Sequence, residues 1–254
     1  WGEYIDKTVI SDFEDKFDCR IIYETFDSNE IMYTKYMSGN SYDVLVPSEY
    51  MIERMIKEDL LQPVDKSLIP NLDNINEGIL GQSFDLSNNY WVPYFCGNVG
   101  ILYDKTVVDE KDLEAGWSIL RNTKYKNQIY MYDSERDSFV VALKALGYSM
   151  NTTKEREINE AYQWLLEQRE EMNPVYVGDE SIDTMISGVK AMAIMYSGDA
   201  AAVMSENPNM GYYMPKEGTN VWFDGFVISK ECKQTKLANE FINYMISDKV
   251  SYKN

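Results

Sequence analysis

The strongest constraint on the fold is the alternation of short apolar strand patterns with amphipathic helix patterns along the 254 residues. A helix pattern at residues 8–17 is followed by the strand patterns RIIYET (20–25) and YDVLVP (42–47), with helix patterns after each. The same rhythm returns later, where QIYMYD (128–133) and VKAMAIMY (189–196) each precede a helix pattern. Because such repeats place largely parallel strands in a sheet covered by helices, the sequence predicts an α/β fold.

Composition excludes several classes of function. The formal charge of −18 argues against a nucleic-acid partner, because such binding needs a basic face. The absence of histidine excludes Ser-His-Asp and Cys-His catalysis, and the three cysteines are too far apart for a zinc site or a disulfide framework. There is no apolar run long enough for a membrane helix and no signal-peptide pattern after Trp1. We therefore expect a globular chain, trimmed at its N-terminus, that uses no metal or cofactor.

Aromatic rings stand beside carboxylates or hydroxyls at the ends of several predicted strands. These residues are Trp1, Glu3 and Tyr4; Ser48 and Tyr50; Tyr132, Asp133 and Asp137; Tyr196, Ser197 and Asp199; and Trp222 with Asp224. In parallel α/β sheets, ligands bind beyond the carboxyl ends of the strands. Aromatic faces attract ammonium groups by roughly 0.5–2 kcal/mol, and charge-assisted hydrogen bonds contribute about 1.5–3 kcal/mol. The pattern therefore favours an organic cation such as a diamine.

The clearest single signal is Asp224, which lies inside the apolar strand pattern VWFDGFVI. A buried carboxylate without a partner costs several kcal/mol or shifts its pKa, so this position indicates a cationic partner, a helix N-terminus or a backbone turn. Trp222 falls on the same side of the strand by its period of two. Asp199 is explained by the N-terminus of a helix and is placed outside the predicted site. Taken singly, the other rings and acids are more typical of core packing and solvated surface.

Six segments, spread over nearly the whole chain, resemble the polyamine-binding components of spermidine/putrescine ABC transporters. They are WGEYID, YETFDSNEIMYTK, YDVLVPSEY, VPYFCGNVGILYD, YDSERDSFVVALKALGYSMNT and MPKEGTNVWFDGFVISK. The resemblance implies a two-lobe periplasmic-binding-protein-like fold with mixed, mostly parallel sheets, whose lobes close on the ligand by hinge motion. It implies lobe 1 at residues 1–98 and 223–254 and lobe 2 at residues 99–222, joined by hinge-crossing strands near 97–102 and 222–226.

The resemblance also implies a set of ligand-binding residues. The matching positions are Trp1, Glu3, Tyr4, Ser48, Tyr50, Ser134, Asp137, Tyr196, Trp222 and Asp224. They correspond to the family patterns W-x-x-Y, V-P-S-x-Y, D-D-x-R-E and W-x-D, together with an aromatic position that lines the site. In the implied arrangement, Asp137, Trp222 and Asp224 surround one terminal ammonium group while aromatic rings cover the methylenes.

Two departures from the family pattern change these expectations. Family members often carry a second aspartate where this chain has Ser134, at a position that meets the internal amine in spermidine-preferring members. The serine leans the prediction toward putrescine, or toward an altered pose of spermidine. Family members also begin with a strand before WGEY and continue past residue 254, which predicts that the chain is truncated at both ends.

The resemblance implies a non-enzymatic receptor outside the cytoplasm that delivers a polyamine to an ABC permease. Such a receptor is periplasmic, or is a cell-surface lipoprotein held by a lipid anchor outside these residues. The residues also leave open a carboxylate-pair glycoside hydrolase or a sugar-binding protein, in which the rings would stack on sugar. A calcium loop at residues 133–144 is disfavoured, because Ser138 and Lys144 replace the glycine and glutamate that an EF-hand requires.

Overall fold

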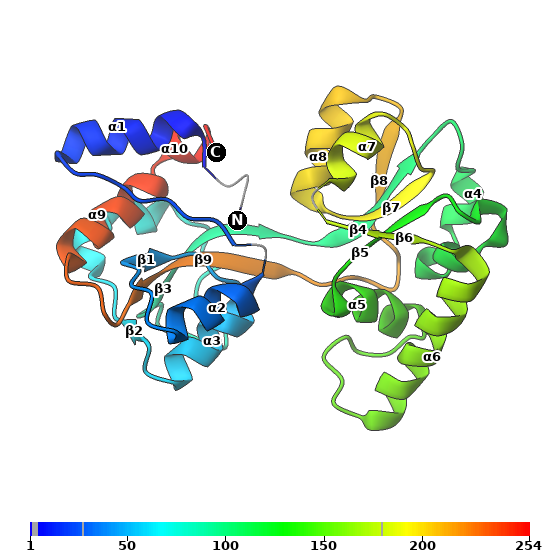
Figure 1. The fold of residues 1–254 in the computed structure, drawn as a ribbon, viewed down its shortest axis with the longest axis horizontal. Helices are drawn as coiled ribbons and strands as arrows, with labels where there is room; N and C mark the ends of the chain where they lie inside the picture. The colour runs from blue at the N-terminus through cyan, green and yellow to red at the C-terminus, as the bar shows by residue number, and fades with distance from the viewer. Residues whose placement is uncertain (2–4, 27, 179) are drawn as a thin grey trace. The chain divides into compact units, whose positions relative to one another are not determined.

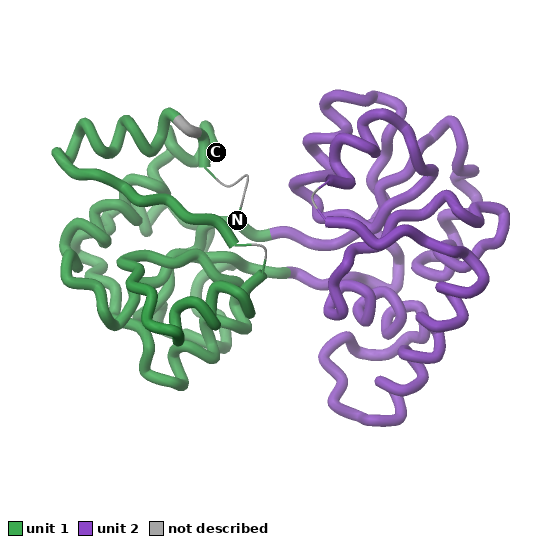
Figure 2. Tube along the Cα trace, viewed as in Figure 1, with its two compact units in different colours: residues 1–96, 222–254 green, residues 97–221 purple. Residues whose placement is uncertain are grey.

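The computed structural model describes residues 1, 5–26, 28–178 and 180–254. The chain forms two compact units, shown as a ribbon in Figure 1 and by colour in Figure 2. Unit 1 comprises Trp1–Cys96 and Trp222–Asn254, and unit 2 comprises Gly97–Val221. The chain therefore leaves unit 1 after Cys96 and returns to it after Val221.

Unit 1 is built around a sheet with the strand order β1-β9-β2, in which β3 also pairs with β9. Its elements are α1 (Lys7–Phe17), α2 (Asn29–Met37), β1 (Val44–Leu45), α3 (Glu49–Lys57), β2 (Leu61–Gln62), η1 (Lys66–Leu68), η2 (Pro70–Asn74), β3 (Trp91–Gly97, whose last residue belongs to unit 2), β9 (Trp222–Ser229), α9 (Thr235–Met245) and α10 (Asp248–Ser251). Side chains of β9 alternate between two cores. Phe226 and Ile228 pack with residues of α9, and Val227 packs with residues of α2 and α3. Helices therefore cover both faces of this sheet (Figure 1).

Unit 2 contains a five-stranded sheet with the order β6-β5-β7-β4-β8. Its elements are β4 (Val99–Asp104), α4 (Glu110–Leu113), η3 (Gly116–Arg121), η4 (Thr123–Tyr125), β5 (Ile129–Tyr132), α5 (Glu135–Ala145), α6 (Glu155–Met172), β6 (Val175–Val177), α7 (Ser181–Ile186), β7 (Met192–Tyr196), α8 (Ser197–Glu206) and β8 (Met210–Tyr213). Ile101 of β4 packs with residues of α5 and α6, and Leu102 packs with residues of α7 and α8. This sheet also has helices on both faces.

Both sheets are α/β sheets, but parallel strands do not predominate as expected. In unit 2, β5 runs parallel to β6 and β7, whereas β4 pairs antiparallel with β7 and β8. In unit 1, β1 and β2 both pair antiparallel with β9. The strands β4 and β9 follow the two points where the chain changes unit, so they enter their sheets without the helical crossover that produces parallel pairing.

The strand predicted at residues 20–25 is wrong. The structure has no strand there, and Ile22 is 91% exposed. The segment follows α1 directly, and the amide of Ile21 donates to the Glu14 Oε1 atom at 2.6 Å instead of to a neighbouring strand. A β-prone sequence forms a strand only where a partner completes the hydrogen-bond ladder, and none does so here among the described residues.

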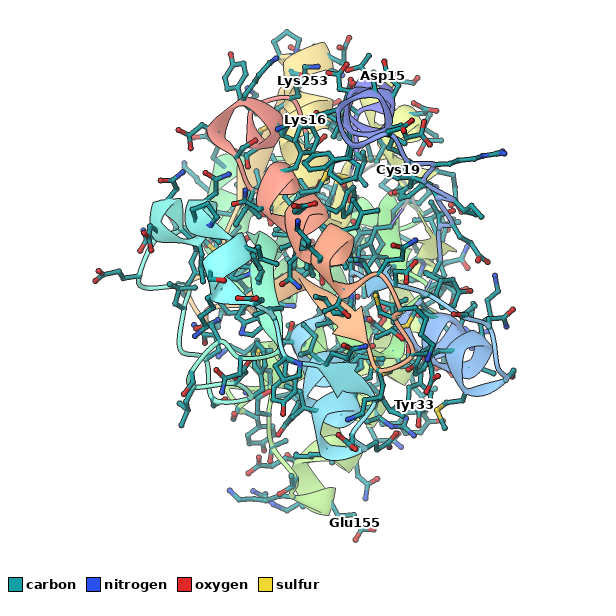
Figure 3. The ribbon with its side chains drawn as sticks, turned by 90° about the vertical axis from the view of Figure 1, so that its left-hand side faces the viewer. Asp15, Lys16, Cys19, Tyr33, Glu155 and Lys253 are labelled. Carbon is teal, nitrogen blue, oxygen red and sulfur yellow. The ribbon has the colours of Figure 1, made fainter. Side chains whose placement is uncertain are left out.

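The first helix, α1, is attached to the C-terminal helices of unit 1. Lys253 Nζ lies 3.2 Å from Asp12 Oδ2, and Lys16 Nζ lies 5.5 Å from the centre of the Tyr244 ring. Figure 3 labels both lysines beside this helix.

Within the described residues, no helix is both long and apolar enough to span a membrane.

Candidate functional site

The candidate site of unit 1 lies where β9 and α3 begin. We call Asn29, Ser48, Glu49, Trp222 and Asp224 the unit 1 cluster. Ser48 forms an isolated antiparallel bridge with Asp224, which brings the start of α3 beside β9. The Glu49 Oε2 atom accepts a hydrogen bond of 3.0 Å from the amide of Phe223. The start of α3 and the start of β9, which are far apart in the sequence, are therefore joined by main-chain and carboxylate contacts.

Asp224 is buried in this cluster, with 3% of its surface exposed. The prediction that this acid sits within a buried strand is therefore confirmed. Trp222, two residues earlier, is half-buried at the first position of β9. The unit 1 cluster therefore brings the carboxylates of Asp224 and Glu49 and the indole of Trp222 to one end of β9. Burial disfavours a bare negative charge, so this arrangement favours a cation as ligand.

Ser48 is held by a residue that the sequence analysis missed. The Asn29 Nδ2 group donates to Ser48 Oγ at 3.0 Å, and the Ser48 amide donates to Asn29 Oδ1 at 3.0 Å. Ser48 is the N-cap residue of α3, yet its side chain makes no capping hydrogen bond. Asn29 is the first residue of α2, directly after the N-cap Ser28, and its position at a helix start gave no sign of this role.

Two more predicted residues of unit 1, Tyr50 and Trp1, form hydrogen bonds with other side chains of this unit. The Tyr50 hydroxyl donates to Glu30 Oε1 at 2.9 Å, which links α3 to α2. The carbonyl oxygen of Trp1 accepts a hydrogen bond of 3.0 Å from the Tyr23 hydroxyl. Glu3 and Tyr4 lie outside the described residues.

In unit 2, stacked tyrosines lie at the carboxyl ends of the parallel strands β5 and β7. The rings of Tyr132 and Tyr196 have centroids 4.5 Å apart and an interplanar angle of 25°. We call these two residues, with Ser134, Asp137 and Asp199, the unit 2 cluster. Ligands of α/β proteins bind at this end of parallel strands, so the position agrees with the sequence argument.

Asp137 lies in the first turn of α5 and is 7% exposed. Its Oδ2 atom accepts a hydrogen bond of 2.8 Å from the Tyr196 hydroxyl. Ser134 is the N-cap of α5, and its Oγ atom accepts from the Asp137 amide at 3.3 Å. Burial raises the pKa of Asp137, while the hydrogen bonds from Ser134 and Tyr196 and the charge of Arg136 oppose the rise. The carboxylate is thus partly desolvated and would gain from a nearby cation.

Asp199 joins this cluster although the sequence analysis placed it outside the site. It lies in the first turn of α8, as its position after Gly198 indicated. The Tyr132 hydroxyl donates to Asp199 Oδ2 at 3.3 Å, so the carboxylate lies beside the stacked rings. Its position near a helix N-terminus was by itself a sufficient reason for an acidic residue. Only the folded arrangement of β5 beside α8 shows the second contact.

Replacing Asp137 with asparagine is expected to raise the free energy of unfolding at pH 7. Because folding raises the pKa of Asp137, the folded protein binds this proton more tightly than the unfolded chain. Ionisation therefore lowers stability as the pH rises through the folded pKa, and the loss is recovered as the pH falls toward the unfolded pKa. The advantage of the variant should accordingly shrink between pH 7 and pH 4 in urea unfolding experiments.

Asp133→Asn is the matched control for this prediction, since Asp133 is exposed in the segment that leads into α5. It should leave the free energy of unfolding at pH 7 close to that of the native protein. An Asp137→Asn protein that is less stable at pH 7, or whose difference from the native protein is the same at both pH values, would contradict the prediction.

Among the described residues, no group of three or more acidic or cysteine side chains is placed to hold a metal ion. The chemistry that the two clusters share is a set of carboxylates beside aromatic rings. Neither contains histidine, which the chain lacks.

Comparisons with known proteins identify the family. Residues 8–253 match the model of the bacterial extracellular solute-binding proteins. The spermidine/putrescine-binding periplasmic protein of Salmonella typhimurium is 32% identical over 257 residues, covering 99% of this chain and 72% of that protein. The putrescine-binding periplasmic protein PotF of Escherichia coli is 27% identical over 281 residues, covering 100% of this chain and 76% of that protein.

Solved structures of related proteins resemble this chain in both sequence and fold. The spermidine/putrescine substrate-binding protein PotD of Streptococcus pneumoniae has a TM-score of 0.84 and 38% identity, covering 100% of this chain and 78% of that chain. The Tp0655 lipoprotein of Treponema pallidum has a TM-score of 0.89 and 27% identity, covering 100% of this chain and 80% of that chain. The predicted α/β periplasmic-binding-protein fold is confirmed, and the chain belongs to the family of bacterial extracellular solute-binding proteins.

Proposed function

We propose that this protein is a polyamine receptor of an ABC transporter and that each unit supplies carboxylates and aromatic rings that bind the ammonium groups. The observation that carries the proposal is the presence, in each unit, of a buried carboxylate at a strand or helix end beside aromatic rings. These carboxylates are Asp224 in unit 1 and Asp137 in unit 2. Several relatives carry names that describe binding of spermidine or putrescine, and none of those names describes a reaction.

The unit 2 cluster suits one ammonium group. Asp137 and Asp199 offer two carboxylates, and the Tyr132 and Tyr196 rings form a stacked pair between them. Burial raises the pKa of Asp137, and the positive charge of Arg136 opposes that rise. A ligand ammonium would therefore supply the positive charge that this buried carboxylate favours.

The energy of such contacts is sufficient for capture of a dilute solute. Each charge-assisted hydrogen bond contributes about 1.5–3 kcal/mol, and a cation over a ring adds roughly 0.5–2 kcal/mol. Two ammonium groups held in this way can reach the roughly 8 kcal/mol that corresponds to micromolar affinity, after the cost of association.

Ser134 supports putrescine as the preferred ligand. Its Oγ atom accepts the Asp137 amide as the N-cap of α5, and a hydroxyl carries no charge to attract an internal secondary ammonium. Spermidine has that third nitrogen and putrescine does not. We therefore propose that putrescine binds at least as tightly as spermidine.

We further propose that the two units are the two lobes of the receptor and that it works outside the cytoplasm, in the periplasm or as a surface lipoprotein. Periplasmic and lipoprotein relatives support this location. An ABC permease is the proposed partner that accepts the polyamine.

Isothermal titration calorimetry tests the ligand. Putrescine and spermidine should each bind, whereas 1,4-butanediol, which has the length of putrescine without its charges, should produce no heat. A cello-oligosaccharide should also produce no heat. Binding of the oligosaccharide alone, or turnover of any glycoside, would replace the proposal with a sugar-directed function. Equal affinity for butanediol and putrescine would exclude ammonium recognition.

A further inference from the structure

Tyr132 has a position in unit 2 that core packing alone does not require. Its hydroxyl oxygen accepts a hydrogen bond of 3.0 Å from the Tyr196 amide, and its proton is donated to Asp199 Oδ2 at 3.3 Å. Its ring stacks on the Tyr196 ring, and 5% of its surface is exposed. The buried Tyr132 side chain therefore contacts both the Tyr196 ring and the Asp199 carboxylate.

The sheet register explains how Tyr132 reaches these partners. Strands β5 and β7 are parallel, with Ile129 opposite Met192 and Tyr130 opposite Ala193. Continued by two residues, this register brings Tyr132 level with the end of β7. There the main chain turns into α8, so the Tyr196 amide lies beyond the last rung of the β5–β7 ladder. The Tyr132 hydroxyl supplies the acceptor for this partly buried amide.

The two hydrogen bonds also have a fixed direction. A hydroxyl has one proton, and the Tyr196 amide occupies an acceptor site on the Tyr132 oxygen, which leaves that proton for Asp199. Burial, and next the negative charge of Asp199, raise the pKa of Tyr132, so the hydroxyl remains protonated at neutral pH. A donor of this kind stabilises the ionised form of Asp199.

Tyr196 is consequently fixed at both ends. Its amide is bound to the Tyr132 hydroxyl, and its own hydroxyl is bound to Asp137. Because its ring also stacks on Tyr132, rotation of the Tyr196 side chain would break both this stacking and the hydrogen bond to Asp137. Loss of the Tyr132 hydroxyl would remove two hydrogen bonds together, the one from the Tyr196 amide and the one to Asp199 Oδ2.

We propose that Tyr132 is a positioning residue, whose hydroxyl orients Asp199 and Tyr196 for one ammonium group of the ligand. This inference rests on the proposed polyamine-binding function. If Tyr132 only fills the core, the loss of its hydroxyl should affect folding and leave the dependence of affinity on Asp199 unchanged. If it positions the site, its effect on affinity should depend on the presence of Asp199.

The test is a double-mutant cycle in the whole chain, read by calorimetric titration with putrescine. Tyr132→Phe keeps the ring and removes only the hydroxyl, and it should weaken binding about tenfold, the value of one hydrogen bond to a charged group. In an Asp199→Ala background, the same change should weaken binding by less than about threefold. Tyr130→Phe, an identical change two residues earlier on β5, is the matched control and should leave the affinity unchanged.

Circular dichroism of each variant shows whether it is folded at the titration temperature. Asp199→Ala alone provides a second variant in which Tyr132 is kept, and it should also weaken binding about tenfold or more. A native protein that binds neither putrescine nor spermidine would overturn the proposed function. A native protein that binds, with Tyr132→Phe within twofold of it, would overturn only the role of Tyr132. A tenfold effect of Tyr132→Phe in both backgrounds would likewise overturn it.

Discussion

An Asp224→Asn variant is expected to bind putrescine at least about a hundredfold more weakly than the native protein while remaining folded. Removal of one partner from a buried, hydrogen-bonded charge pair costs roughly 2–5 kcal/mol or more of binding energy. Asp224 is 3% exposed, so water does not screen its interaction with a bound ammonium group. Asparagine has nearly the same shape and keeps the main-chain bridge to Ser48.

Asp59→Asn is the matched control for this effect. Asp59 belongs to the same unit and pairs with Lys230 on the surface, where its side chain is 82% exposed. It has a positive φ of 56°, which asparagine adopts readily. The control removes one negative charge from the protein without touching the unit 1 cluster, and it should bind putrescine within about twofold of the native protein. Equal losses in both variants would show that the net charge of the protein attracts the ligand, and native affinity in Asp224→Asn would remove Asp224 from the site.

Several helices and buried strands of this protein follow from its residue periodicity. The apolar pattern over Ile158, Ala161 and Leu165 indicates a helix that the structure shows as α6, and VWFDGFVI indicates a strand that the structure shows as β9. In α6 the pattern locates the helix but not its buried face, because Ile158 is 37% exposed while Glu157, Trp164 and Gln168 are buried.

The predictions that proved wrong depend on contacts between segments. The segment RIIYET has the composition of a strand, but its structure depends on whether another strand lies beside it, and a single segment cannot specify that. The direction of β4 and β9 in their sheets depends on where the chain changes unit, which also lies outside local patterns.

The candidate site shows the same division. Asp224 could be found because a charge within an apolar strand contradicts its local sequence. Asn29, Tyr132 and Asp199 each have an ordinary explanation where they stand, as a helix start, a strand residue and a helix N-terminal acid. Their hydrogen bonds to Ser48 and Tyr196, or to each other, arise only when separate elements pack together. Residues that support a site are therefore harder to predict than residues that violate a local pattern.

A Gly225→Ala variant is expected to lose about 3 kcal/mol of unfolding free energy, the upper part of the range for overfilling a packed core. A Cβ atom at residue 225 would lie 2.5 Å from Trp91 Cε3 and 2.7 Å from the carbonyl oxygen of Val92. Trp91 is fully buried, and its ring packs against Phe84 with centroids 4.8 Å apart. Neither the indole nor the β3 backbone can move aside without disturbing the unit 1 core.

Thermal unfolding measures this loss, which should lower the Tm by roughly 6–12 °C at 2–4 °C per kcal/mol. Gly198→Ala is the control, because no atom lies within 4 Å of its added methyl group and alanine favours the helix in which it stands. A Tm of Gly225→Ala within 2 °C of the native value would show that β3 and β9 are less tightly packed than this geometry requires. The expected loss would instead show that the close approach of β3 to β9 requires glycine directly after Asp224. The buried acid and the glycine would then be separate requirements at adjacent positions, the first for the ligand and the second for the sheet that holds it.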